Sequence, residues 1–275
     1  MAEDYEIKRF RQAITTKLAN VPFISTYAKT RGRAYVIAWC HRISGTGLVA
    51  YVMLHIYTLS SLETPAEFNA KMKLFSFFIF RLLEWLLAIP VIFHALNGAR
   101  LILYESFGCR DDETMTRWVL GLSAVYVLLM GMLMIMGNQS VTPLFFWLIA
   151  LIISTSLAYL VASKVWHSGT SIAWKFQRIT GAFLLIMVTA HLLFEHINPS
   201  VGHEAGVVID RIQHFFIKVT DLALVIAILY HGGYGLLSIA KDYLQSKVLK
   251  SSCAMLIIVI MVIFAWIGLR LTLLV

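Results

Sequence analysis

The chain is poor in charged residues and in cysteine, and each shortage excludes a class of protein. Charged residues make up 14% of the 275 residues and hydrophobic residues 59%, which is too apolar for a water-soluble domain. The three cysteines, Cys40, Cys109 and Cys253, are isolated from one another, so they cannot ligate an iron–sulfur cluster or build a disulfide framework. The sequence also lacks a glycine-rich dinucleotide-binding fingerprint. Iron–sulfur and dinucleotide-binding proteins are therefore excluded.

Seven apolar segments are long enough to cross a bilayer, which takes about 20 helical residues. They cover residues 36–61, 74–103, 117–137, 142–163, 176–197, 214–240 and 252–274, and the mean hydropathy of the chain is +0.78. The first 35 residues are polar, without the apolar core of a cleavable signal peptide. We therefore predict an all-α integral membrane protein whose first span is an uncleaved signal anchor.

Lys and Arg are concentrated on one side of the predicted membrane, which marks the cytoplasmic side. The N-terminal segment and the even-numbered loops contain Lys8, Arg9, Arg11, Lys17, Lys29, Arg31, Arg33, Arg110, Lys164, Lys175, Lys241, Lys247 and Lys250. The odd-numbered loops contain only Lys71, Lys73 and Arg211. We expect a multi-pass protein of the inner (cytoplasmic) membrane with a cytoplasmic N-terminus. Its net charge of +8 would attract anionic lipid and acidic partners, and not nucleic acid, because it flanks membrane spans.

A motif in the first half of the chain recurs in the second half. Arg42-Ile43-Ser44-Gly45 followed by His55 returns as Arg178-Ile179-Thr180-Gly181 followed by His191, with the same gap between motif and histidine. His94 with Gly98 returns as His231 with Gly235 at almost the same offset along the chain. These echoes predict two three-helix repeats, residues 36–141 and 171–275, after a cytoplasmic tail of residues 1–35 with an amphipathic helix near Ile7–Ala19.

Residues 142–170 have no counterpart and are predicted to contain an extra connecting helix. Because each repeat has an odd number of spans, this helix lets both repeats enter the membrane from the cytoplasm, as a parallel pair. At about 1.5 Å per residue, His55 then lies roughly 27 Å from the inner boundary and His94 roughly 14 Å. His191 shares the outer level with His55, and His231 shares the inner level with His94.

Histidines paired at two depths suggest two bis-histidine haems in a four-helix core. Imidazole is an axial ligand of haem iron, and helix bundles bind flat cofactors between facing helices. Gly98 and Gly235 follow His94 and His231 by four residues, so they lie on the same helical face and leave room for a macrocycle. The alternative is that the histidines are polar contacts between helices, but four in register favour haem.

The motifs resemble those of the membrane anchors of succinate dehydrogenase and fumarate reductase. His41-Arg42-Ile43-Ser44-Gly45 with His94-x-x-x-Gly98-x-Arg100 is similar to the large anchor subunit, and His231-x-x-x-Gly235 with Asp242-Tyr243 to the small one. From about residue 36 onward the chain resembles the two anchors fused through an extra helix, in the di-haem form. The resemblance implies an inner haem on His94 and His231 and an outer haem on His55 and His191.

The resemblance also implies a quinone site, for menaquinone or ubiquinone, at the cytoplasmic helix ends. Its residues would be Arg42, Ser44 and the pair Asp242 and Tyr243. Arg42, Ser44 and Tyr243 would donate hydrogen bonds to the quinone, and donors that stabilise a developing oxyanion suit its reduction. Arg42 could instead bind a haem propionate, as could His41, or a lipid phosphate, and Tyr243 could be an interfacial anchor. The pattern departs from the family at Gln177, which replaces the second copy of His41, and at Ala38, where some members have serine.

Two ionisable pairs lie near the outer level, Arg81 with Glu84 and Lys218 with Asp221. Charges at this depth are costly and often functional. We interpret Arg81 and Lys218 as candidates for outer-haem propionates, and the acids as candidates for a proton route or a second quinone site. Interfacial salt bridges within each pair are the alternative. Four further histidines are expected to be solvated or interfacial and not ligands: His167, His196, His203 and His214.

The resemblance implies partners on the cytoplasmic face: a flavoprotein subunit with FAD and an iron–sulfur subunit, which the basic tail could help to seat. Electrons would pass from succinate through these subunits to haem and quinone, or in reverse for fumarate, and the chain alone would not oxidise succinate. Two alternatives remain open. One is a di-haem cytochrome b anchor of another respiratory dehydrogenase, and the other is a seven-span transporter without a cofactor.

Overall fold

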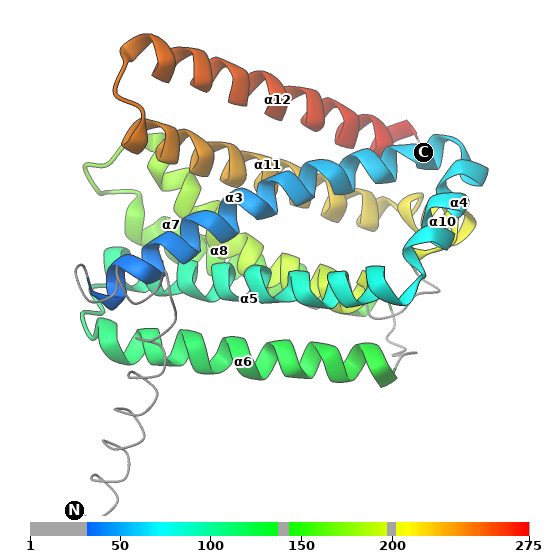
Figure 1. Ribbon diagram of the computed structural model, residues 1–275, viewed down its shortest axis with the longest axis horizontal. Helices are drawn as coiled ribbons and strands as arrows, with labels where there is room; N and C mark the ends of the chain where they lie inside the picture. The colour runs from blue at the N-terminus through cyan, green and yellow to red at the C-terminus, as the bar shows by residue number, and fades with distance from the viewer. Residues whose placement is uncertain (1–31, 137–142, 197–201, 275) are drawn as a thin grey trace, which may run out of the picture. The chain divides into compact units, whose positions relative to one another are not determined.

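In the described part of the chain, seven helices are long and apolar enough to span a membrane, as the sequence predicts (Figure 1). The computed structural model describes residues 32–136, 143–196 and 202–274, and in these residues the chain forms helices and loops without strands. The tail helix predicted near Ile7–Ala19 lies outside the described residues. The long helices are α3 (Arg33–Leu59), α5 (Phe78–Ser106), α6 (Asp112–Met136), α7 (Pro143–Val165), α8 (Ile172–His191), α11 (Phe215–Tyr243) and α12 (Lys247–Leu274).

The chain divides into two compact units between Ile43 and Ser44, inside α3. In the first unit, the rings of Tyr35 and Trp39 meet edge to face with centroids 6.3 Å apart. The second unit contains all the remaining helices and the C-terminal part of α3. All contacts described below belong to the second unit.

Residues at the helix ends explain several helix boundaries. The Ser171 side chain accepts a hydrogen bond from the backbone N–H of Trp174 at 3.3 Å and so caps the start of α8. Gly108 ends α5 with a φ of 72°, which L side chains rarely adopt, and the next N–H, of Cys109, then reaches the carbonyl of Leu103 at 3.2 Å. Pro90 lies inside α5 and leaves the helix without one backbone donor.

The helices of the second unit pack around α8, which contacts α5, α7 and α11. Helix α6 packs on α5 and α12 packs on α11. Both outer contacts are close because of a glycine: a Cβ at Gly131 would lie 2.6 Å from Nε1 of Trp85, and one at Gly268 would lie 2.9 Å from Cγ1 of Val225. The indole N–H of Trp85 donates to the carbonyl of Val127 at 3.0 Å. Helices α6 and α12 thus lie outside the histidine-bearing helices.

Corresponding helices of the two halves run in the same direction. In Figure 1, α5 and α11 run from right to left, whereas α6, α8 and α12 run from left to right. One constant offset relates α5 to α11, since 215 − 78 and 243 − 106 both equal 137. Gly131 and Gly268, which bring the outer helices close, are related by the same offset.

Two short helices that the sequence analysis did not predict, α4 (Pro65–Phe75) and α10 (Ala205–Ile212), pack together at one end of the bundle. The second span was predicted from residue 74, but a break at Ser76 and Phe77 separates α4 from α5. The Asn69 side chain accepts a hydrogen bond from the N–H of Ala205 at 2.9 Å. Their shared apolar cluster consists of Leu62, Phe68, Met72, Ala205, Val208, Ile212 and Leu271.

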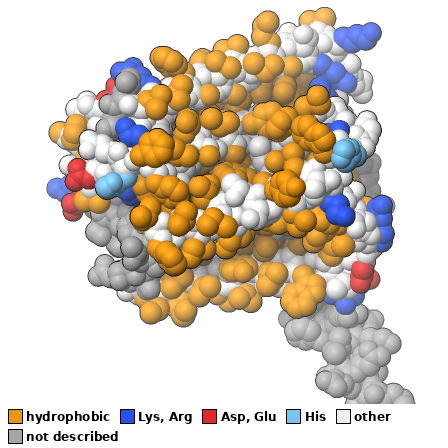
Figure 2. All heavy atoms as spheres, turned by 180° about the vertical axis from the view of Figure 1, so that it is seen from behind, with side chains coloured by type: hydrophobic (Ala, Val, Ile, Leu, Met, Phe, Trp, Pro, Cys, Tyr) orange, Lys and Arg blue, Asp and Glu red, His pale blue; other side chains and the backbone are white. Residues whose placement is uncertain are grey.

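The surface is typical of a membrane protein. On the face in Figure 2, hydrophobic side chains form a broad belt, and charged side chains gather at its two ends. Many large apolar residues are exposed on the outer helices, among them Ile135 at 88% and Trp266 at 65%. Such exposure would be unfavourable in water, so this belt is suited to contact lipid.

Candidate functional site

His94 of α5 and His231 of α11 face each other inside the bundle, and we call them the inner pair. Their ring centroids lie 6.3 Å apart and their planes are nearly perpendicular, at 88°. The Ser44 hydroxyl lies 3.3 Å from Nδ1 of His94, and the Thr180 hydroxyl lies 3.5 Å from Nδ1 of His231. The same contact therefore occurs in both halves of the chain.

Gln177 contacts His231 through its backbone and its side chain. Its carbonyl oxygen lies 3.3 Å from Nδ1 of His231, and its amide nitrogen Nε2 lies 3.4 Å from Nε2 of the ring. A carbonyl at Nδ1 favours the tautomer in which Nδ1 carries the proton and donates. The lone pair on Nε2 then faces the amide of Gln177, and a metal bound at Nε2 would take the place of that amide. The position that departs from the family pattern thus lies directly at a predicted ligand.

The glycines of the repeated motif let the inner rings approach α3 and α8. A Cβ at Gly45 would lie 2.7 Å from Cε1 of His94, and one at Gly181 would lie 3.1 Å from Cε1 of His231. A Cβ at Gly235 would meet Nε2 of Gln177 only at 3.9 Å. The motifs predicted space next to Gly98 and Gly235, but they did not predict the close approach of the histidine rings to Gly45 and Gly181.

Three histidines, not two, meet at the other level, and we call His55, His191 and His196 the outer cluster. The centroids of His55 and His191 lie 5.9 Å apart, with their planes at 86°. His196 lies 5.9 Å from His55 and 5.3 Å from His191. One nitrogen of each ring can be chosen so that all three lie within 4.8 Å of one another. Tyr51 stacks on His55 at 5.8 Å.

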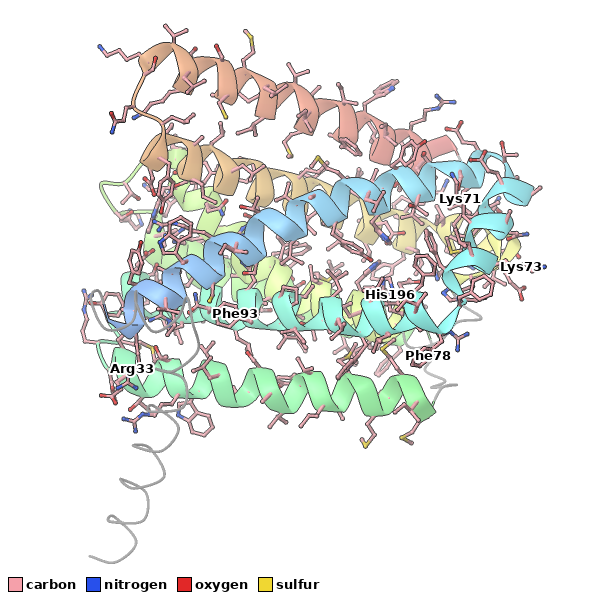
Figure 3. The ribbon with its side chains drawn as sticks, in the orientation of Figure 1. Arg33, Lys71, Lys73, Phe78, Phe93 and His196 are labelled. Atoms are coloured by element: carbon pink, nitrogen blue, oxygen red, sulfur yellow. The ribbon has the colours of Figure 1, made fainter. Side chains whose placement is uncertain are left out.

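The expectation that His196 is solvated is wrong. A π-helical turn, η2 (Leu192–His196), follows α8 and brings His196 back to the side of the bundle where His191 lies. The side chain of His196 is only 18% exposed, and its Nδ1 pairs with the carboxylate of Glu84 on α5. Figure 3 labels His196 among the side chains of the bundle. Spacing in the sequence did not reveal it because the α-helical period does not hold in a π-turn.

Both histidine sites fit the haem that the sequence predicts. Two imidazoles on opposite sides of one metal ion have centroids roughly 6 Å apart, because each metal–nitrogen bond is about 2.0–2.1 Å. The observed separations are 6.3 Å for His94 and His231 and 5.9 Å for His55 and His191. In the described residues, Nδ1 of His191 is buried without a hydrogen-bond partner, which is unusual for a native polar atom. The donor set and the spacing therefore suit a bis-histidine iron.

Further ionisable groups lie in the outer part of the bundle. Glu195 and Arg211 form an ion pair at 2.5 Å whose side chains are 11% and 15% exposed. In the described structure, neither Glu84 nor Asp221 pairs with the base three residues before it: Glu84 pairs with His196 instead. The salt bridges considered as an alternative for the two ionisable pairs are therefore absent there. Arg81 is exposed and Lys218 is half-buried.

The remaining histidines lie outside the spans. His167 and His214 are exposed, whereas His203 is half-buried. Burial lowers the pKa of His203 below its ordinary value; Glu84 opposes this shift, while Arg81 and His196 add to it.

The residues predicted to bind quinone belong to both units. Ser44 contacts the His94 ring, as described above. Asp242 and Tyr243 are exposed at the end of α11, and Tyr243 is 48% exposed. His41 and Arg42 lie on α3 in the first unit and are half-buried.

Two arginines of the second unit, Arg178 and Arg100, bind residues of neighbouring helices. Arg178, the second copy of Arg42, binds Glu105 at 2.5 Å and lies over the ring of Trp174 at 4.7 Å. Arg100 is buried, donates to Asn97 at 2.9 Å and forms an ion pair with Asp112 of α6. Arg178 thus joins α8 to α5, and Arg100 joins α5 to α6.

Comparison with known proteins shows the family of the chain. The model of the succinate dehydrogenase/fumarate reductase transmembrane subunit family matches residues 28–133 and 158–269, which contain the inner pair and the outer cluster. The chain belongs to this family. A similar protein is the succinate dehydrogenase 2 membrane subunit SdhC of Mycobacterium tuberculosis (strain ATCC 25618 / H37Rv). It is 36% identical over 104 residues, which cover 36% of this chain and 74% of that subunit. No solved structure matches this family member.

Proposed function

We propose that this transmembrane subunit is the di-haem cytochrome b anchor of a succinate:quinone oxidoreductase. It would pass electrons between an iron–sulfur subunit and membrane quinone. The observation that carries the proposal is the presence of facing imidazoles at two levels of the bundle, each with centroids close to 6 Å apart. The three isolated cysteines cannot ligate an iron–sulfur cluster, and the sequence has no dinucleotide fingerprint. Substrate oxidation would therefore depend on partner subunits.

The proposed iron ligands are His94 and His231 at the inner level, and His55 and His191 at the outer level. Haem bound there would supply one-electron carriers whose potential depends on axial ligands and nearby hydrogen bonds. Ser44 and Thr180 would orient the inner imidazoles through Nδ1, and such contacts also raise the basicity of a ligand.

Quinone would bind at the ends of these helices that lie towards the cytoplasm. We propose Arg42, Ser44, Asp242 and Tyr243 as its ligands, because Arg42, Ser44 and Tyr243 offer charged and hydroxyl donors for a carbonyl that gains negative charge. Menaquinone and ubiquinone both have such carbonyls. Since Ser44 also contacts His94, its hydroxyl would lie between the inner haem ligand and the quinone.

Basic side chains are proposed to hold the haem propionates: His41 at the inner level, and Arg81 and Lys218 at the outer level. Glu84 and Asp221 lie on the same helices as these outer bases, three residues further on. They are candidates for a proton route or a second, outer quinone site, because a carboxylate held inside a membrane protein can accept and release protons.

The partners we propose are a flavoprotein subunit with FAD and an iron–sulfur subunit, docked on the cytoplasmic face of the inner membrane. The excess of Lys and Arg in the N-terminal segment and the even-numbered loops supports this orientation. Basic loops at that face would also attract anionic lipid head groups.

We further propose that residues 36–141 and 171–275 are parallel repeats joined by the helix in residues 142–170. Three observations support this: the common direction of corresponding helices, the constant offset between α5 and α11, and the like contacts of Ser44 and Thr180 with their histidines. Duplication would explain why the two haem centres use the same kinds of residue.

Haem stoichiometry tests the proposal most directly. The subunit, purified in detergent, would be analysed by visible absorption and pyridine haemochrome, and we expect two haems b per chain. A preparation without a Soret band would contradict every cytochrome interpretation and favour a transporter. The assembled complex should reduce a soluble quinone analogue with succinate, whereas the isolated chain should not.

A further inference from the structure

The outer cluster contains one more histidine than a bis-histidine iron needs. His191 and His196 are five residues apart, and a π-turn with its i→i+5 hydrogen bonds places such residues on one side of a helix. The turn Leu192–His196 therefore presents both rings to His55, with their own centroids 5.3 Å apart. In the first half, the position that corresponds to His196 is Ser60, in the 3₁₀ helix η1 (Ser60–Glu63), so the third histidine is specific to the second half.

His191 and His196 are equally well placed relative to His55. Both centroids lie 5.9 Å from that of His55, and suitable nitrogens of all three rings lie within 4.8 Å. Distance alone therefore assigns His55 as a ligand but does not choose its partner.

The surroundings of the two rings differ in a way that favours His196. A histidine ligand usually holds a carboxylate or carbonyl at its second nitrogen, which fixes the tautomer and the orientation of the ring. Glu84 occupies this position at Nδ1 of His196, so Nε2 of His196 is left for a metal. Nδ1 of His191 is buried and has no partner in the described residues. The repeated motif favours His191 as the iron ligand, whereas the carboxylate of Glu84 favours His196.

We propose that His196 is an alternative axial ligand of the outer haem, able to replace His191 opposite His55. This inference rests on the proposed function. In the exchange one iron–nitrogen bond replaces another, and the oxidation state of the iron does not change. Glu84 acts as a positioning residue that holds the substitute ring in the correct tautomer.

The test uses the assembled complex with His191→Ala, His196→Ala, the double variant and His55→Ala. Haem content and the low-temperature electron paramagnetic resonance spectrum are measured. We expect two low-spin haems per chain in each of the first two variants and one haem in the double variant. His55→Ala should also lose the outer haem, although both other histidines remain.

A single haem in His191→Ala, with the inner haem intact, would overturn the inference, because His196 would then have failed to replace the lost ligand. The inner haem signal reports whether the complex has assembled. If His191→Ala does not assemble, His191→Gln is measured in its place, and failure of both variants while His55→Ala assembles would also count against the inference. If the complex with the unaltered chain contained no haem, this result would instead refute the proposed function.

Discussion

The contact between Gly45 and His94 gives a sharp test of how the inner haem is held. Alanine at position 45 would place a Cβ 2.7 Å from Cε1 of His94, whereas alanine at 181 would place it 3.1 Å from Cε1 of His231. Ordinary van der Waals contact begins near 3.4 Å. The His94 ring would therefore have to move by about 0.7 Å and the His231 ring by about 0.3 Å, and sites tolerate roughly 0.5 Å before a ligand set loosens.

We expect Gly45→Ala to weaken inner haem binding and Gly181→Ala to weaken it less. Overpacking costs about 1–3 kcal/mol, whereas the higher helix propensity of alanine is the same with and without haem and cancels in the affinity. A net loss of about 1.4 kcal/mol corresponds to roughly tenfold weaker binding. The assay is haem dissociation from the purified subunit to an excess of an acceptor globin, followed in the Soret band.

The matched control is Gly47→Ala on the same helix. A Cβ there meets nothing within 4 Å, so inner haem release should be unchanged. Equal release from Gly45→Ala and Gly47→Ala would refute the reasoning, because it would show that haem binding does not depend on the close approach of the ring.

Four other outcomes are expected. His94→Leu or His231→Leu should abolish the inner haem and spare the outer one, measured as one haem per chain; an intact inner haem after His94→Leu would contradict the ligand assignment. Arg211→Met should leave Glu195 as an unpaired buried carboxylate and cost about 3–5 kcal/mol, seen as a lower midpoint of thermal unfolding in detergent, whereas Arg211→Met with Glu195→Gln should recover most of that loss. Burial lowers the pKa of His203, so the folded chain binds this proton more weakly than the unfolded chain; the free energy of unfolding should therefore be unaffected by this group above pH 6.5 and should decrease as the pH falls below that value. An NMR titration should give a midpoint below 6.5 that Arg81→Gln raises, and a midpoint that Arg81→Gln leaves unchanged would contradict the electrostatic explanation. Arg100→Met should loosen α5 from α6 by removing the bonds to Asn97 and Asp112, which hydrogen exchange at the start of α6 would detect, with Arg117→Met, an exposed residue paired with Glu113, as the control.

The seven spans could be predicted because each one is a simple consequence of length and apolarity. A lipid-facing helix must satisfy its backbone internally and present apolar side chains, and this requirement is visible in any window of about 20 residues. The facing of His94 with His231, and of His55 with His191, follows from the spacing of the motifs, and the structure brings each pair together.

Features that depend on departures from the α-helix could not be read in this way. His196 enters the outer cluster through a π-turn, and its sequence position had suggested an outer loop. Helices α4 and α10 have only 11 and 8 residues, too few to span a bilayer, so the criterion of a long apolar run does not predict them. The ion pairs of Glu84 and Glu195 join residues far apart in sequence or on different elements, and therefore depend on packing that no local pattern encodes.

Pro90 makes the two histidine-bearing helices α5 and α11 mechanically unequal. It lies inside α5 between Glu84 and His94, while the residue at the corresponding position of α11 is the buried Ala227. A proline deprives the carbonyl four residues earlier, that of Leu86, of its helical donor and makes bending easier at that point. Bending of α5 at this point would therefore tilt its outer half, which contains the Glu84 carboxylate that pairs with His196, relative to its inner half. Helix α11 would remain straight.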